Sequence, residues 1–135
     1  MSVPEQLDWD VVRNRAAQIP EAAFQFVREG LGHTVKSIQA QGADTMATDT
    51  PRHVTGQQLC FGLRDLAIER YGKLAGTVFR RWGVRRTDDF GVMVYALIDR
   101  GEMKRSDGDS IDDFHAVYDF EESFAGPDSL EPAHS

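Results

Sequence analysis

The sequence predicts a mainly α-helical, compact single domain of five or six helices. Apolar residues recur every three or four positions over most of the chain, and several of these segments begin with residues that cap helices. No alternating run of β-branched residues exceeds about four, so a sizeable sheet is not expected. The chain has 135 residues, a length that fits one domain. We therefore expect one domain over 1–135, with an ordered core over about 8–122.

The first two helices are expected on either side of Pro20. A short helix over about 8–18 precedes this proline. A longer helix over about 21–40 follows it, and its buried side is marked by apolar residues three or four apart: Phe24, Val27, Leu31, Val35 and Ile38. The polar stretch 42–51 lacks this periodicity and is expected to form a connecting loop.

Two further helices are predicted in the middle of the chain. Thr55 and Gln58 have the spacing of a capping box, and Gly72 ends the helix that they begin. Its buried stripe consists of Leu59, Leu63, Leu66 and Ala67. A short helix then runs to Gly83, with three apolar residues expected to face the core: Leu74, Val78 and Trp82.

The last long helix is predicted over about 87–100, with Thr87, Asp88 and Asp89 at its capped start. Its buried stripe consists of Phe90, Val94, Leu97 and Ile98. Ser110 and Asp113 have the spacing of another cap, which opens a short helical or turn-like segment. Between these elements, Asp107-Gly108 favours a tight turn, and a small β-hairpin over 103–110 is an open alternative.

The order of helices over 55–110, with this hairpin, also fits a winged-helix module. In such a module the last helix lies in the major groove of DNA and contacts phosphates. The outward positions expected here include three acidic residues and a tyrosine: Asp88, Asp89, Asp99 and Tyr95. Because acidic side chains repel phosphates, sequence-specific DNA binding by this helix is not favoured.

Charge is distributed unevenly along the chain. The whole chain has a net charge of −7, yet residues 1–105 carry +2 and residues 106–135 carry −9. Dense like charge predicts a disordered tail over about 125–135, and residues 1–6 are expected to be disordered as well. No apolar run approaches the roughly 18 residues of a membrane span, and Cys60 is the single cysteine, so we expect a cytoplasmic protein without membrane contact.

Four arginines surround a tryptophan in the segment Phe79-Arg-Arg-Trp-Gly-Val-Arg-Arg-Thr87. Arg80, Arg81, Arg85 and Arg86 could bind phosphates while Trp82 stacks on a base. In the alternative interpretation, the arginines pair with the domain's own acids and Trp82 completes the core stripe. The second interpretation is favoured, because acidic partners are available within the same chain.

The C-terminal segment combines aromatic and acidic residues: Phe114, Tyr118, Phe120 and Phe124 with Asp119, Glu121 and Glu122. Aromatic side chains at this density are expected to pack onto a surface, because burial of each is favourable by roughly 1.5–3 kcal/mol. We expect them to pack on the domain itself, with the acids against the arginines. In the alternative, the segment docks on another protein or on a second copy of the chain.

Candidates for catalysis or metal binding are few. Cys60, His53 and His115 stand in no motif of known geometry, and no pair of histidines has the spacing of metal ligands. The acidic run from Asp107 lacks the glycine and the glutamate that a calcium loop requires. The sequence therefore predicts no metal, no cofactor and no enzymatic activity.

Three segments resemble a small conserved family described from planctomycetes and verrucomicrobia, whose function has not been characterised. They are His53-Val-Thr-Gly-Gln-Gln-Leu59, Trp82-Gly-Val-Arg-Arg-Thr-Asp-Asp-Phe-Gly91 and Asp112-Asp-Phe-His-Ala-Val-Tyr-Asp-Phe120. The likeness extends over about residues 24–124, and the second segment is the most distinctive. The resemblance implies a stand-alone bacterial domain, and it implies no catalytic residue or cofactor.

The function predicted from these features is that of a non-enzymatic protein-interaction or adaptor domain. Its expected binding surface consists of Arg80, Arg81, Trp82, Arg85, Arg86, Phe114, Tyr118 and Phe120, and its expected partner is another protein or a second copy of the chain. The second hypothesis is a domain that binds nucleic acid or a phosphate ligand through the four arginines. The third is an enzyme of unrecognised type with residues near His53, Cys60 or His115.

Overall fold

A computed structural model of the chain describes residues 8–40, 54–105 and 109–124, and within these ranges all regular structure is helical. The helices are α1 (Trp9–Ala16), α2 (Glu21–Ile38), α3 (Gly56–Tyr71), α4 (Ala75–Trp82), α5 (Thr87–Asp99) and α6 (Phe120–Ser123), with short 3-10 helices η3 (Gly72–Leu74) and η4 (Ile111–Phe114). The predicted mainly α fold is confirmed. The loop expected over 42–51 and the disorder expected over 1–6 and 125–135 lie outside the described residues.

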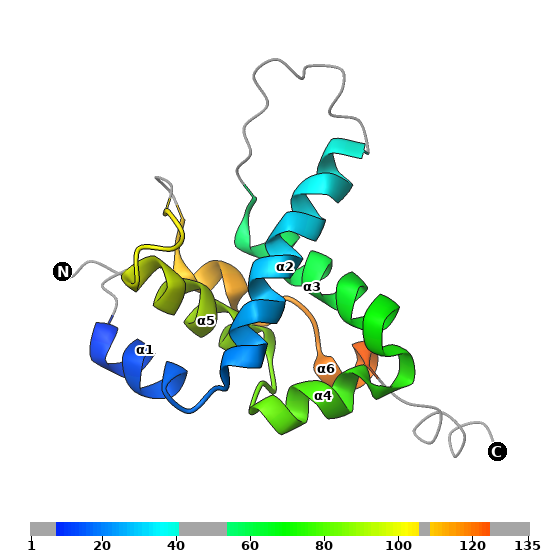
Figure 1. Cartoon of the computed structure of the whole chain (residues 1–135), viewed down its shortest axis with the longest axis horizontal. Helices are drawn as coiled ribbons and strands as arrows, with labels where there is room; N and C mark the ends of the chain where they lie inside the picture. Colours follow the sequence, from blue (N-terminus) through cyan, green and yellow to red (C-terminus); the bar gives the residue numbers. More distant parts are fainter. Residues whose placement is uncertain (1–7, 41–53, 106–108, 125–135) are drawn as a thin grey trace.

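Helix α5 is buried on nearly all sides. In Figure 1 it lies between α1 and the 3-10 helix η4. Its sequence is apolar around its whole circumference from Phe90 to Leu97, which is typical of an interior helix. The prediction that Asp89 and Tyr95 face outward is wrong, because they are only 3% and 2% exposed. Helix α1 covers that side, where the rings of Trp9 and Tyr95 lie 6.3 Å apart.

The burial of α5 also excludes its use as a DNA-reading helix in the winged-helix manner. Helices α3, α4 and α5 follow the predicted order, but the third is covered by α1, α2, α3 and η4. No residue of 103–105 or 109–110 belongs to a strand, and residues 106–108 of the expected hairpin lie outside the described part of the chain. Among the described helices, none is both long and apolar enough to cross a membrane.

Helices α2 and α3 approach each other closely through two glycines. A Cβ atom on Gly30 would lie 2.2 Å from Leu63 Cδ2, and one on Gly62 would lie 1.7 Å from Thr34 Oγ1. Thr34 is held in place because its hydroxyl donates to the Gly30 carbonyl at 2.7 Å. Toward its end α2 extends away from the body of the fold (Figure 1). The predicted stripe residues Leu31, Val35 and Ile38 are accordingly only half-buried there.

Substitution of Gly62 by alanine is expected to lower the free energy of unfolding by about 1–3 kcal/mol, because the new methyl group overlaps Thr34 and forces the helices apart. Gly32→Ala in α2 is the matched control. A Cβ there meets nothing within 4 Å, so the variant should gain up to about 1 kcal/mol from better helix propensity. Urea unfolding measures both. Equal stabilities of the two variants would contradict the close packing of α2 and α3.

Helix α4 faces the core with a different set of residues from the one expected. Ala75 and Phe79 are 1% exposed, whereas Leu74 is 63% exposed and Val78 is half-buried. Leu74 belongs to the 3-10 turn η3, where the helical spacing extrapolated from Trp82 does not apply. Phe79 consequently occupies the centre of an aromatic cluster. The centroid of its ring lies 5.2–5.9 Å from the ring centroids of Phe26, Trp82, Phe90, Phe120 and Phe124.

Candidate functional site

The arginines lie at the end of α4 and in the turn between α4 and α5. The backbone of this turn is held firmly at its α4 end. Gly83 adopts a left-handed conformation (φ 82°), which ends the helix. Its N–H donates to the Arg80 carbonyl at 3.0 Å, and the N–H of Val84 donates to the Phe79 carbonyl at 2.9 Å. Val84 is 1% exposed, so its side chain anchors the turn in the core.

Asp89 holds the other end of this turn. Its Oδ2 accepts hydrogen bonds from the N–H groups of Arg85 and Arg86, at 2.8 and 3.2 Å, and its Oδ1 forms an ion pair with Arg15 of α1. Of the predicted capping residues, Asp89 does cap the helix, by accepting from the N–H of the N-cap residue Arg86. Thr87 does not, because its hydroxyl donates to the Phe114 carbonyl at 2.7 Å. The sequence thus predicted Asp89 as a capping residue, but not its burial or its ion pair with Arg15.

The four side chains of Arg80, Arg81, Arg85 and Arg86 are exposed, and we call them the arginine surface. None of them forms an ion pair with a carboxylate of the described residues, so the expected internal pairing is not found in that part of the chain. Other arginines do have such partners: Arg13 with Asp99, Arg28 with Glu21 and Glu102, Arg64 with Asp65, and Arg70 with Glu29. The arginine surface is therefore distinct from the paired arginines.

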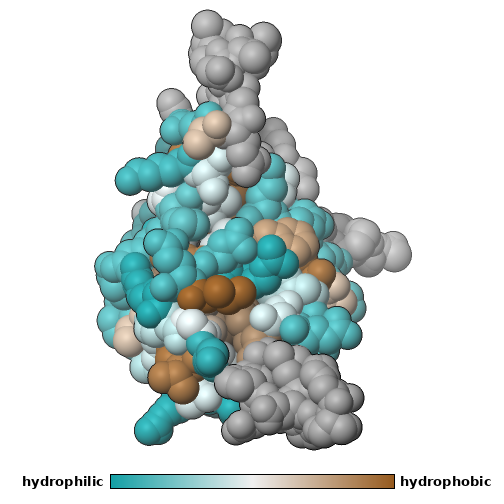
Figure 2. All heavy atoms as spheres, turned by 90° about the vertical axis from the view of Figure 1, so that its right-hand side faces the viewer, coloured by the Kyte–Doolittle hydropathy of each residue, from teal (hydrophilic) through white to brown (hydrophobic). Residues whose placement is uncertain are grey.

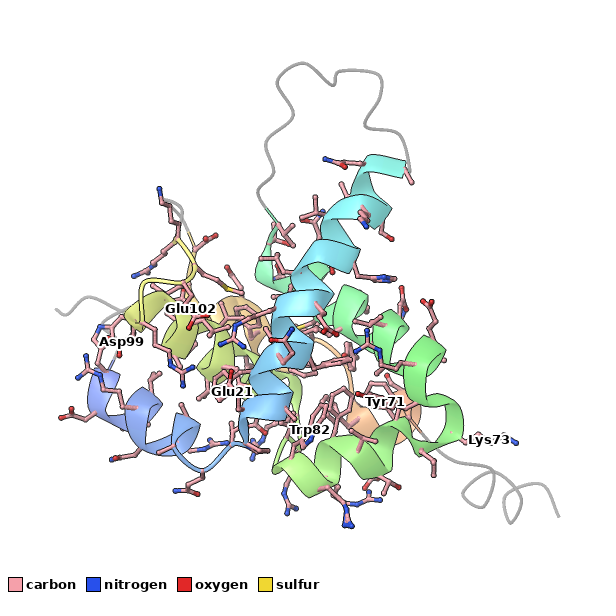
Figure 3. All side chains as sticks on the ribbon, viewed as in Figure 1. Glu21, Tyr71, Lys73, Trp82, Asp99 and Glu102 are labelled. Atoms are coloured by element: carbon pink, nitrogen blue, oxygen red, sulfur yellow. The ribbon has the colours of Figure 1, made fainter. Side chains whose placement is uncertain are left out.

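Trp82 belongs to the core rather than to an open binding face. It is half-buried and lies on the side of α4 that faces α2 (Figure 3). Its ring centroid is 5.6 Å from that of Phe26, 6.2 Å from that of Tyr71 and 5.9 Å from that of Phe79. This is the arrangement that the core interpretation of Trp82 predicts.

The aromatic residues of the C-terminal segment pack on the chain's own core. Phe114 is 4% exposed, and Phe120 contacts the rings of Phe79 and Phe90 at 5.4 and 5.6 Å. The Tyr118 hydroxyl donates to the Cys60 carbonyl at 2.9 Å. Phe114, Tyr118 and Phe120 are therefore occupied by internal packing, and they do not form an open surface with the arginines.

The acids of this segment do not fulfil the role expected for them. Asp119, Glu121 and Glu122 are exposed, and within the described ranges none of them forms an ion pair with the arginine surface. Among the described residues, the segment is therefore held by its aromatic side chains and not by ion pairs of these three acids.

Exposed hydrophobic side chains are scattered. The largest are Val11, Phe61, Ile68 and Leu74. On the face shown in Figure 2, hydrophobic areas are small and separated by hydrophilic residues. That face therefore has no large apolar patch of the kind that marks a binding site.

His115 forms a pair with Asp88 at the surface, with His115 Nδ1 2.8 Å from Asp88 Oδ2. The hydrogen bond and the charge of Asp88 raise the pKa of His115 above its ordinary value of 6.5. Burial alone would raise the pKa of Asp88, but hydrogen bonds from His115 and from the N–H of Ala116 together hold it below 3.8. The pair thus ties the start of α5 to the segment after η4.

This pair predicts a pH-dependent stabilisation. Because the folded pKa of His115 is raised, the contribution of the pair is fully present below pH 6.5 and is lost as the pH rises through the raised pKa. In an NMR titration, His115 should titrate at higher pH in the unmodified chain than in Asp88→Asn. Identical titration curves would show that the pair does not form in solution.

The residues named for the enzymatic hypothesis do not form a group of catalytic side chains within the described part of the chain. Burial raises the pKa of the Cys60 thiol to about 12, so the sulfur is not a thiolate at neutral pH. His115 is exposed beside Asp88, and His53 lies outside the described residues. Nor does any group of three or more His, Cys, Asp or Glu side chains in the described part of the chain have the arrangement of a metal site.

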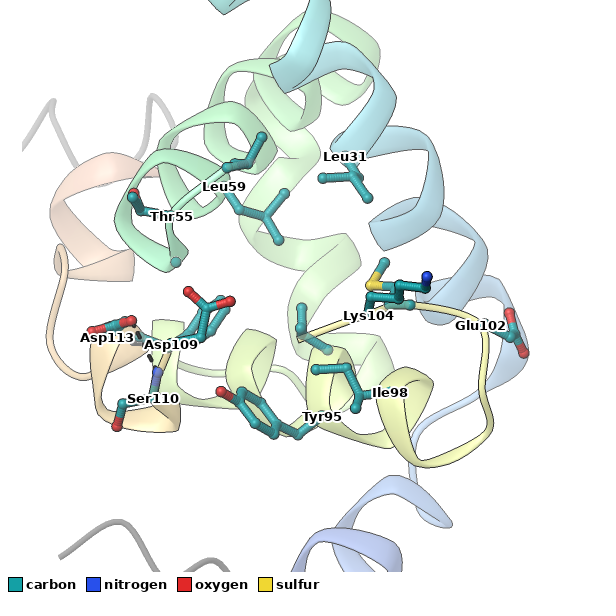
Figure 4. Close-up of a pocket in the computed structure, with 15 residues that line it drawn as sticks. Leu31, Thr55, Leu59, Tyr95, Ile98, Glu102, Lys104, Asp109, Ser110 and Asp113 are labelled. Atoms are coloured by element: carbon teal, nitrogen blue, oxygen red, sulfur yellow. Dashed lines mark hydrogen bonds between the residues drawn. The ribbon is translucent and has the colours of Figure 1, made fainter. Parts of the chain in front are cut away.

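A pocket of about 460 Å³ lies away from the arginine surface. It opens between the start of α3, the second half of α5 and the segments 102–104 and 109–114 (Figure 4). Sequence reasoning did not detect this pocket, because its walls come from segments far apart in the chain. The capping residues Thr55, Ser110 and Asp113, which were recognised separately, all line it.

Comparisons of the chain with protein-family models, with curated proteins and with solved structures gave no match.

Proposed function

We propose that this chain is a cytoplasmic protein-interaction domain whose arginine surface binds an acidic segment of a partner protein. The observation that supports this function is that Arg80 and Arg81 at the end of α4, and Arg85 and Arg86 in the turn after it, are exposed without an acidic partner among the described residues. Guanidinium groups bind carboxylates through two parallel hydrogen bonds, so this surface suits glutamate and aspartate side chains.

The rigidity of the turn favours binding. Gly83, Val84 and Asp89 fix its backbone before any partner arrives. A surface whose backbone is already ordered loses less conformational entropy on binding than a mobile one. Only the arginine side chains then have to be ordered.

A protein partner is favoured over nucleic acid by two features. Binding of single strands commonly uses exposed aromatic rings on which bases stack, whereas the Trp82 ring is engaged with Phe26, Tyr71 and Phe79. The net charge of −7 also repels a long polyanion such as nucleic acid, which extends beyond the arginine surface, more than it repels a short acidic segment. The short and locally basic turn instead suits a short acidic segment.

The proposal is tested by fluorescence anisotropy with a fluorescein-labelled peptide rich in glutamate and aspartate. The unmodified chain should bind the peptide, and the affinity should fall as salt is added. The double variant Arg80→Glu/Arg81→Glu should bind at least about tenfold more weakly, because two attractive charges become repulsive.

A matched control keeps the net charge of this double variant but changes it elsewhere. Lys36→Glu/Lys104→Glu alters the end of α2 and the segment that follows α5, both remote from the turn, and it should bind the peptide nearly as well as the unmodified chain. If both double variants lost the same peptide affinity, the loss would come from the change in net charge and not from the arginine surface. Tighter binding of single-stranded DNA of the same length than of the peptide would favour the nucleic-acid hypothesis instead.

We also propose that the chain belongs with the planctomycete and verrucomicrobial family that its motifs resemble. The most distinctive segment, residues 82–91, has a clear structural purpose: Trp82 packs in the core, Gly83 ends α4 and Asp89 caps α5. Gly91 lets Phe114 approach, since a Cβ there would lie 3.0 Å from the Phe114 side chain. The segment thus supports a shared fold.

A further inference from the structure

The pocket between the start of α3 and the second half of α5 has the volume of a small-molecule site. Its volume of about 460 Å³ lies within the range of roughly 300–1,000 Å³ that is typical of ligand pockets. Figure 4 shows Leu31 of α2, Leu59 of α3 and Ile98 of α5 around the same space. Three helices therefore contribute apolar side chains to its walls.

Hydrogen bonds and close packing fix the wall that α3 and η4 form. The start of α3 is held by the reciprocal capping bonds of Thr55 and Gln58, at 2.9 and 3.0 Å. Gly56 allows η4 to approach, because a Cβ at that position would lie 2.8 Å from Asp113 Cβ. Asp113 in turn accepts a hydrogen bond from the N–H of Ser110 at 3.2 Å. This wall is thus a defined part of the fold.

The segment 102–104, which lines the opposite side, is fixed as well. The N–H of Glu102 donates to the Leu97 carbonyl of α5 at 2.9 Å. The Glu102 carboxylate pairs with Arg28 of α2 at 2.8 Å. Because both sides are attached to the helices by specific contacts, the space between them is present before a ligand arrives.

Apolar side chains in this pocket remain partly exposed in the chain alone. Leu59, Val94 and Phe114 line it and are buried. Four further apolar residues of the lining are only half-buried: Leu31, Val54, Ile98 and Met103. An apolar ligand would remove part of this surface from water, which is favourable in proportion to the area that it covers.

The charges around the pocket favour an uncharged ligand. An anion at the η4 end would lie near the Asp113 carboxylate. A cation there would lie near the N-terminus of α3, which carries a partial positive charge. At the opposite rim, Glu102 is already paired with Arg28, and Lys104 is exposed to solvent. A charged ligand would therefore lose hydration without a matching gain from the pocket.

We propose that this pocket binds an uncharged, mainly apolar small molecule whose ring system lies against Leu59, Val94 and Ile98. Burial of the ring against these side chains supplies the binding free energy. A neutral polar group such as a hydroxyl can stay at the rim in contact with water, so it loses little hydration. This site is separate from the arginine surface and does not depend on the function proposed for it.

Naphthalenemethanol, naphthalenemethylamine and naphthoate form a suitable probe series at neutral pH, since they share a ring system and differ in charge. In NMR titrations of the full chain, the alcohol should shift the methyl resonances of Leu59, Val94 and Ile98 in a saturable way. The methyl resonances of Val11 and Ile68, which are exposed elsewhere, should not shift. The amine and the carboxylate should each bind at least about tenfold more weakly, because their charges have to be desolvated. Absence of saturable binding of the alcohol, or equal affinity for either charged probe, overturns the proposal.

Two variants and one control locate the binding. Ile98→Trp fills the pocket from a half-buried position on α5 and should weaken binding of naphthalenemethanol at least about tenfold. Leu31→Trp fills it from α2 and provides the same test if Ile98→Trp does not fold, which circular dichroism checks. Ile68→Trp makes the same substitution at an exposed position of α3 that does not line the pocket, and it should leave the affinity unchanged. Unchanged affinity of a folded Ile98→Trp or Leu31→Trp variant refutes the assigned site.

Discussion

Phe79→Ala is expected to lower the free energy of unfolding by about 3–5 kcal/mol, the largest effect of any single substitution considered for this chain. Phe79 is 1% exposed, and its ring contacts residues of α2, α5 and α6 in one cluster. Removal of the ring leaves a cavity that the surrounding aromatic side chains cannot fill without losing their own contacts.

Urea or thermal unfolding followed by circular dichroism measures this loss. Phe61→Ala is the control: Phe61 is 39% exposed and should lose about 1 kcal/mol or less. Phe79→Leu, which keeps most of the apolar volume, should lie between the two. If Phe79→Ala were no more destabilising than Phe61→Ala, the aromatic cluster would not be the centre of the core.

Asp89→Ala is expected to lower the free energy of unfolding by about 3 kcal/mol. The substitution leaves the N–H groups of Arg85 and Arg86 without their acceptor and removes the partner of Arg15. Most of the loss comes from the two N–H groups, because the Arg15 side chain is 46% exposed and water can compensate its charge.

Asp99→Ala provides a close comparison within the same helix. Asp99 also pairs with an arginine of α1, Arg13, but the pair lies at the surface, and little change in stability is expected. Asp89→Asn, which retains an oxygen acceptor for the turn, should lose less than Asp89→Ala. Equal stabilities of the Asp89→Ala and Asp99→Ala variants would contradict the role of Asp89 in holding the turn between α4 and α5.

Features encoded by neighbouring residues were predictable from the sequence. The capping box of Thr55 and Gln58 is present, with reciprocal hydrogen bonds of 2.9 and 3.0 Å. Gly72 and Gly83 end their helices with positive φ angles, as predicted. Such signals involve only residues within a few positions of each other, and the stripe from Leu59 to Ala67 is buried as expected for the same reason.

Features that depend on contacts between distant segments were not predictable. The pattern of α5 does not reveal that α1 covers Asp89 and Tyr95, because the two helices are separated by most of the chain. Two acids that are close to the arginine surface in sequence have other partners: Asp89 pairs with Arg15, and Asp88 with His115. Composition counts available charges but does not say which of them meet.

The central claim is that Arg80, Arg81, Arg85 and Arg86 form an interaction surface because none of them has a carboxylate partner among the residues that the structure describes. Its most direct measurement follows the side-chain Nε–H resonances of all arginines by NMR while a glutamate-rich peptide is added. We expect saturable shifts at these four arginines and almost none at Arg13, Arg28 and Arg70, whose guanidinium groups already pair with carboxylates. Shifts confined to the paired arginines, or no saturable shift at any of the four, would contradict the claim.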